Sequence, residues 1–116
     1  MDLNISHETQ ICNGKIKITG SKSETNRLLL LKAFFKNFKI ENKSNSDDSL
    51  VMESALNSTS DLIDIQHAGT AMRFLTAYFS QLEGREVVLT GSSRMQQRPI
   101  KILVEALKSL GANIEY

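Results

Sequence analysis

The spacing of apolar residues predicts four amphipathic helices. Apolar side chains recur every three or four positions over residues 21–38, 46–56, 71–82 and 99–110, and this is the period of one helix face. The expected apolar stripes are Leu28, Leu31, Phe35 and Phe38; Val51, Met52, Ala55 and Leu56; Met72, Leu75, Phe79 and Leu82; and Ile100, Leu103, Val104, Leu107 and Leu110. We expect these stripes to face a common core.

Two of the helices carry clear end signals. Ser21 is followed three residues later by Glu24, which is a capping-box pattern. Pro99 is expected at the first position of the last helix, and Gly111 is expected to end it.

Strands are predicted between the helices. Alternating or short apolar runs occupy residues 15–19, 39–42, 61–65, 86–91 and 112–116. Strands that alternate with helices predict an α/β (α+β) fold, with helices covering a sheet, in a single partial domain over residues 1–116. The order strand, Thr-Gly-Ser, cation, turn, cation and helix occurs twice, at residues 15–34 and 86–107, which suggests a repeated unit.

Composition limits the possible functions. The chain has 116 residues, a net charge of +1 and 6% aromatic residues, which argues against a nucleic-acid-binding protein. Neither a secretory signal nor a membrane span is apparent, so a cytoplasmic location is expected. Cys12 is alone, so an internal disulfide or a cysteine-rich zinc site is excluded, and we expect it to be partly buried in a strand. We find no metal-ligand set and no catalytic triad pattern.

Three strand-to-helix junctions combine a glycine, a hydroxyl group and cations. They are Gly20, Ser21, Lys22, Ser23 and Arg27; Gly69, Thr70 and Arg73; and Gly91, Ser92, Ser93, Arg94 and Arg98. A cation at the positive end of a helix is unfavourable unless an anion is present. Glycine N–H groups and hydroxyls at helix starts bind phosphate or carboxylate groups. One such junction is most simply a capped turn, but three together favour an anion-binding site at one end of the sheet.

Other polar residues have simpler interpretations. Asp47 and Asp48, beside Ser46, are expected to cap a helix rather than to act as paired carboxylates. His67 is expected to hydrogen-bond within its loop. Met72 and Met95 are expected in the core.

Three motifs in register resemble one family. The segments "GSKSETNRLLLL", "AGTAMRFLTAYF" and "LTGSSRMQQRPIKILVEALKSLGANIEY" resemble the N-terminal motifs of 5-enolpyruvylshikimate-3-phosphate synthases. The resemblance implies two lobes built from repeated βαβαββ units. It also implies transfer of the enolpyruvyl group from phosphoenolpyruvate to the 5-hydroxyl of shikimate 3-phosphate, with release of phosphate, in the route to chorismate and aromatic amino acids. No metal or organic cofactor is implied.

The resemblance also assigns substrate-binding residues. Lys22 matches the lysine that reaches both substrates, and Ser23 and Arg27 match the pair that holds the shikimate carboxylate. Gly69 matches the glycine whose backbone approaches phosphoenolpyruvate, and Arg94 matches the arginine on its phosphate. In the second motif, Thr70 and Arg73 are also implied, mainly in shaping the loop.

The family pattern also implies what this chain lacks. Its proton-transfer carboxylates lie beyond Tyr116, so no catalytic residue is assigned here and the chain is expected to be an inactive N-terminal part without its C-terminal lobe. His67 and Phe74 depart from the usual asparagine and proline, and the connection over residues 56–65 is shorter than usual. The exposed sheet edge is expected to promote self-association.

Two alternatives stay open. One is a stand-alone anion-binding or regulatory module. The other is a relative of UDP-N-acetylglucosamine enolpyruvyl transferase, which the shikimate-type pattern of Lys22, Ser23, Asn26 and Arg27 disfavours.

Overall fold

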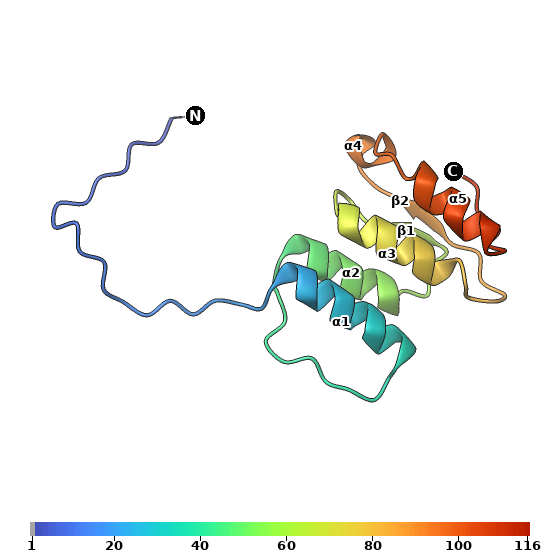
Figure 1. Ribbon diagram of the computed structural model, residues 1–116, viewed down its shortest axis with the longest axis horizontal. Coiled ribbons are helices and arrows are strands. Elements are labelled where there is room, and N and C mark those ends of the chain that lie inside the picture. The colour runs from blue at the N-terminus through green and yellow to red at the C-terminus, as the bar shows by residue number, and fades with distance from the viewer. Residues whose placement is uncertain (1) are drawn as a thin grey trace.

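The computed structural model describes residues 2–116 and contains five helices and two strands within them. In chain order these are α1 (Lys22–Phe34), α2 (Asp47–Asn57), β1 (Leu62–Asp64), α3 (Gly69–Phe79), β2 (Val88–Thr90), α4 (Ser93–Gln96) and α5 (Lys101–Ser109). Figure 1 shows residues 2–20 as an extended arm that leaves the folded body. Helices and a small parallel sheet confirm the α/β class.

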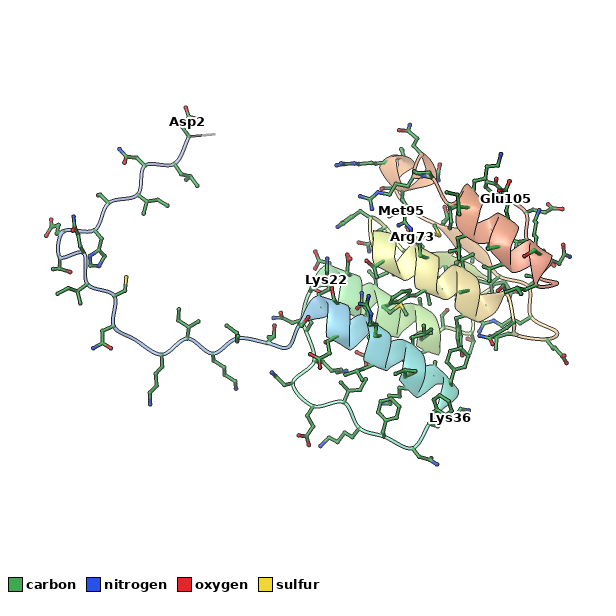
Figure 2. All side chains as sticks on the ribbon, viewed as in Figure 1. Asp2, Lys22, Lys36, Arg73, Met95 and Glu105 are labelled. Atoms are coloured by element: carbon green, nitrogen blue, oxygen red, sulfur yellow. The ribbon has the colours of Figure 1, made fainter. Side chains whose placement is uncertain are left out.

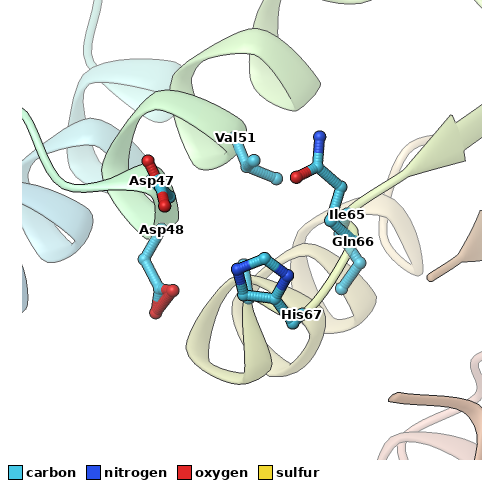
Figure 3. A pocket seen from close by; sticks show the side chains of 7 residues that line it. Asp47, Asp48, Val51, Ile65, Gln66 and His67 are labelled. Carbon is cyan, nitrogen blue, oxygen red and sulfur yellow. The ribbon is translucent and has the colours of Figure 1, made fainter. Parts of the chain in front are cut away.

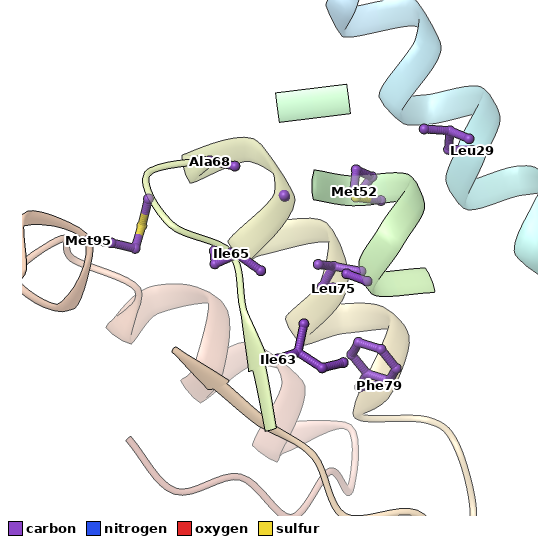
Figure 4. Close-up of a cluster of buried hydrophobic side chains, with 10 residues drawn as sticks. Leu29, Met52, Ile63, Ile65, Ala68, Leu75, Phe79 and Met95 are labelled. Carbon is purple, nitrogen blue, oxygen red and sulfur yellow. The ribbon is translucent and has the colours of Figure 1, made fainter. Parts of the chain in front are cut away.

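Three helices form the main layer beside the sheet. Figure 1 shows that α1, α2 and α3 run in the same direction, so that their N-terminal ends lie at one side of the molecule. The core between them and the strands is drawn in Figure 4 and consists of Leu29, Met52, Ala55, Ile63, Ile65, Ala68, Ala71, Leu75, Phe79 and Met95. The predicted inward faces of α2 and α3 and the buried position of Met95 are therefore confirmed.

The buried face of α1 differs from the predicted stripe. Its start is as expected, since Ser21 is the N-cap and accepts a hydrogen bond from the Glu24 backbone N–H at 3.4 Å. Its buried residues, however, are Thr25, Asn26 and Leu29, whereas Leu31 and Phe35 are 46% and 65% exposed. The run of leucines over residues 28–31 fits more than one face. Polar contacts with α2 select the buried one.

Only two of the five predicted strands form within residues 2–116. β1 and β2 are parallel, with Ile63 opposite Leu89. Residues 15–19, 39–42 and 112–116 are not strands, because a strand needs a hydrogen-bonded neighbour and these segments have none. The expected half-buried position of Cys12 is also wrong, since its thiol lies exposed on the arm. The repeated unit stays a prediction, because within residues 2–116 only its second copy contains a strand.

The C-terminal part differs slightly from expectation. The short helix α4 was not predicted, and Pro99 precedes α5 by two residues rather than occupying its first position. Gly111 ends this part as expected, with a φ of +99°, and its N–H donates to the Lys108 carbonyl at 3.0 Å. Leu110 is 84% exposed, so it does not belong to the buried stripe of α5.

A hollow of about 1190 Å³ lies between α3, β2, α5 and residues 113–116. No helix within residues 2–116 is long and apolar enough to cross a membrane. In the same residues, no cluster of histidine, cysteine and carboxylate side chains has the composition of a metal site.

Candidate anion-binding site

The segments that follow the two strands meet at one edge of the sheet. The Gln66 carbonyl, just after β1, accepts a hydrogen bond from the Ser92 N–H at 2.8 Å. Gly91 makes this approach possible, because a Cβ there would lie 2.5 Å from the same carbonyl oxygen. The second and third cationic junctions therefore converge at the carboxyl edge of the parallel strands, as the sequence predicts.

Two guanidinium groups lie at the entrance of α3. A Cβ on Gly69 would collide with Nη1 of Arg98 and would lie 3.7 Å from Nη1 of Arg73. Arg73 also donates to the Gly69 carbonyl at 3.1 Å and to the Pro99 carbonyl at 3.5 Å. Arg73 is thus fixed across the gap between α3 and the start of α5.

The entrance of α3 carries no compensating negative charge of its own. The first turn of α1 contains Glu24, and the first turn of α2 contains Asp47 and Asp48, whereas the first turn of α3 contains no acidic residue. A helix N-terminus bears a positive partial charge, and two guanidinium groups add to it here. An anion with several acceptor oxygens would be stabilised at this place.

The first junction lies on the neighbouring helices. The Lys22 ammonium lies 3.3 Å from Oδ1 of Asp48 at the start of α2. Arg27 donates to the Ser23 carbonyl at 2.8 Å, and its guanidinium lies 5.6 Å from the centre of the Phe74 ring on α3. Figure 2 shows Lys22 at the N-terminal end of α1 and Lys36 beyond its other end.

The start of α2 lies beside the loop that enters α3. A small pocket lies between the start of α2 and the loop that enters α3, and Figure 3 shows Asp48 and His67 among its lining residues. Ala68, which is also in this pocket, precedes Gly69 directly. Asp48 thus pairs with Lys22 and also lines the pocket that His67 and Ala68 line beside the α3 entrance.

The remaining predicted residues lie along the same side of the molecule. Thr70 is half-buried in the first turn of α3, and Ser23 is exposed in the first turn of α1. Arg94 is exposed on α4, where Ser92 is the N-cap and accepts from the Met95 N–H at 3.3 Å. The expected hydrogen bond of His67 is absent within residues 2–116, and its ring is exposed.

A polar seam, which sequence reasoning missed, joins α1 to α2. We use this name for five residues, Thr25, Asn26, Ser44, Ser46 and Ser49. Thr25 Oγ1 accepts from the Ser44 N–H at 3.0 Å, and Ser49 Oγ donates to Asn26 Oδ1 at 2.9 Å. Ser46 Oγ lies 3.1 Å from the hydroxyls of both Ser44 and Ser49. The serine-rich stretch "SNSDDS" is the only sequence signal of this seam.

The sequence did not indicate the contacts that Arg98 and Asp48 make in the candidate site. Arg98 appears in the third junction, but nothing in its spacing indicates that it reaches Gly69. Asp48 was interpreted as a cap, whereas Ser46 is the N-cap of α2 and Asp48 pairs with Lys22. Both contacts join residues that are at least 26 positions apart.

Comparison with known proteins gives one consistent family. The family model of EPSP synthase (3-phosphoshikimate 1-carboxyvinyltransferase) matches residues 34–116. A 3-phosphoshikimate 1-carboxyvinyltransferase of Bacteroides fragilis is 52% identical over 102 residues, which cover 87% of this chain and 25% of that protein. The enzyme of the same name from Actinobacillus pleuropneumoniae is 40% identical, with 89% of this chain and 31% of that protein covered. No solved structure matches the chain.

The coverage values show two further facts. The chain spans between 25% and 31% of the length of these relatives. The comparison with the Actinobacillus protein extends over 133 residues, more than the 116 of this chain. That relative therefore has additional residues within the matched region.

Proposed function

The chain belongs to the EPSP synthase family, and we propose that it supplies substrate-binding residues for enolpyruvyl transfer from phosphoenolpyruvate to shikimate 3-phosphate. In this proposal Lys22, Ser23 and Arg27 hold shikimate 3-phosphate, and Lys22 also reaches phosphoenolpyruvate. Both relatives named above are 3-phosphoshikimate 1-carboxyvinyltransferases by name, and the segment "GSKSETNRLLLL" that bears these three residues resembles the first motif of the family.

The observation that carries this proposal is the cationic entrance of α3. Arg73 and Arg98 converge on Gly69 at a helix start that has no acidic residue in its first turn. We assign phosphoenolpyruvate to this entrance, with the backbone of Gly69 facing it, Thr70 and Arg73 shaping it, and Arg94 contributing from α4. Cations and helix N–H groups here would offset the repulsion between two bound polyanions.

The proposed role of these residues is to position substrates. Holding two reactants in a fixed relative geometry replaces a bimolecular encounter by a reaction between bound neighbours. In this proposal the side chains described here bind the two substrates and orient them. We further propose that the elements form part of the repeated βαβαββ architecture of this family.

The proposal is tested by titrating the isotope-labelled 116-residue chain with shikimate 3-phosphate and following amide NMR shifts. We expect weak binding, with the largest shifts at the start of α1, where Lys22, Ser23 and Arg27 lie. Lys22→Met is expected to weaken binding about three- to tenfold, because a charged hydrogen bond is lost at a half-exposed site.

Lys36→Met is the matched control, since it removes the same charge at the far end of α1 and should leave the affinity unchanged. An equal loss of affinity in Lys22→Met and Lys36→Met would show that only the net charge of the chain matters, and not the position of Lys22. Tight binding of a phosphorylated ligand by the wild-type chain alone would instead favour a stand-alone anion-binding module.

A further inference from the structure

The Lys22–Asp48 ion pair is unequally buried. The Asp48 side chain is 17% exposed, whereas the Lys22 side chain is 49% exposed, with 3.3 Å between its Nζ and Oδ1 of Asp48. The carboxylate is therefore the anchored partner. An ammonium group has three donors, so contact with one carboxylate oxygen leaves donors of Lys22 free to face the solvent side.

The helix dipole affects the two charged partners in opposite ways. Asp48 lies in the first turn of α2, where a carboxylate is stabilised by the helix dipole. Lys22 is the first residue of α1, where an ammonium is destabilised by the same effect. Asp48 thus needs no cation for its own placement, while Lys22 gains from the nearby carboxylate.

The polar seam fixes the distance between the two helix starts. Asn26, which is fully buried, accepts from the hydroxyl of Ser49, the residue that follows Asp48. Thr25 is bonded to the Ser44 N–H just before α2. These contacts hold the first turn of α2 against α1 and place the Asp48 carboxylate beside Lys22.

A purely stabilising ion pair does not account for this arrangement. Half-exposed pairs contribute little to folding, since ordering two side chains offsets most of the attraction. A lysine side chain also loses much rotamer freedom when it binds a ligand. If a carboxylate already orders the ammonium before the ligand arrives, less rotamer freedom is lost on binding.

We propose that Asp48 is a positioning residue, which orders the Lys22 ammonium at the entrance of α1 so that its free donors face the incoming anion. This inference rests on the proposed function for its ligand, but the ordering of Lys22 is measurable without any ligand. It assigns to Asp48 a role that acts through Lys22 and not through contact with the substrate.

The first measurement is ¹⁵N relaxation of the lysine ammonium groups in the ligand-free 116-residue chain. We expect Lys22 to be more ordered than Lys36, and Asp48→Asn to reduce its order to that of Lys36. Asp48→Glu, which keeps the charge, should restore part of the order. Lys22 order that is unchanged in Asp48→Asn would overturn the proposal.

The second measurement is a double-mutant cycle for binding of shikimate 3-phosphate in high salt. High salt screens the general attraction that an anion gains when a carboxylate is removed. Asp48→Asn is expected to weaken binding at least threefold, with no further loss when it is added to Lys22→Met. An equal loss in the Lys22→Met background would show that Asp48 acts independently of Lys22 and would overturn the proposal.

Glu53→Gln provides the matched control. The Lys43 ammonium lies 2.7 Å from Oε2 of Glu53, in an ion pair that involves neither Lys22 nor Asp48. Breaking this pair should change neither Lys22 order nor affinity. If the wild-type chain binds no shikimate 3-phosphate, the proposed function fails, while ammonium relaxation still decides the role of Asp48.

Discussion

At the scale of single residues, two glycines in the site differ in what surrounds them. A Cβ on Gly69 would meet the tips of two arginine side chains, whereas a Cβ on Gly91 would meet the Gln66 carbonyl and the side chain of buried Met95. A flexible side chain moves at little cost, but a backbone carbonyl in a hydrogen bond does not. The same methyl group therefore has different consequences at the two positions.

We expect Gly69→Ala to change the free energy of unfolding by less than about 1 kcal/mol, since alanine is the better helix former and only arginine tips must move. Gly91→Ala should destabilise by about 1–3 kcal/mol, because overpacking forces the backbone to shift. Urea unfolding of both variants measures the difference. Similar losses in the two would show that Arg98 cannot move away from Gly69.

Ser49→Ala tests the polar seam. The Asn26 Nδ2 is already buried without a partner within residues 2–116, and removal of the Ser49 hydroxyl would leave the Asn26 Oδ1 unpaired as well. We expect a loss of about 1–3 kcal/mol, which is the cost of an unsatisfied buried polar group. Urea unfolding provides the measurement.

Ser54→Ala is the control for this change, because Ser54 lies on the exposed side of the same helix. Its free energy of unfolding should stay the same or rise slightly. A seam variant as stable as this control would mean that the bonds among Asn26, Ser46 and Ser49 do not join the helices.

At the scale of elements, the sequence predicts helices better than strands because helix bonds are local. Ser46 and the spacing of Met52 and Ala55 determine where α2 starts and which side faces inward. Residues 15–19 have the alternation of a strand, but strand formation depends on a neighbour that no local pattern specifies. Asn42 adopts a φ of +49°, which is incompatible with the strand expected at residues 39–42.

The candidate site was likewise predictable only where its sequence signals are local. The Gly-hydroxyl-cation pattern identified the helix starts, and the parallel strands bring two of them together. Partners such as Asp48 for Lys22 were not predictable, because the seam that aligns α1 with α2 consists of serine and asparagine contacts between distant positions.

Ile63 and Ile18 both lie in predicted strands, but only the strand that contains Ile63 forms. Ile63 on β1 is 5% exposed, and Ile18 on the arm is 76% exposed. Ile63→Ala should lower the free energy of unfolding by about 2–5 kcal/mol, because it removes buried methyl groups and leaves a cavity. Ile18→Ala should change it by less than about 0.5 kcal/mol. Thermal unfolding followed by circular dichroism compares them, and a large loss for Ile18→Ala would show that the arm packs on the body.

At the scale of the whole molecule, the chain is more extended than its length requires. Its radius of gyration is 18.4 Å, whereas a compact chain of this size has a radius of about 13 Å. The arm accounts for part of this difference. The hollow beside α5 and the 85% exposure of Ile102 add apolar surface that the described residues do not cover.

We therefore expect the chain to self-associate as its concentration rises. Neither outer edge of the β1–β2 pair has a neighbouring strand within residues 2–116, and unpaired strand edges promote association. Sedimentation velocity over a wide concentration range measures this. A constant monomer mass throughout that range would contradict the expectation.

The exposed thiol of Cys12 has a practical consequence for such experiments. Air oxidation can join two copies through their arms, and each copy would keep its native core. Such a disulfide-linked dimer would have the mass of an associated pair at every concentration. A reducing agent or a Cys12→Ser variant removes this species, and the same single thiol accepts a spin label that reports on the arm alone.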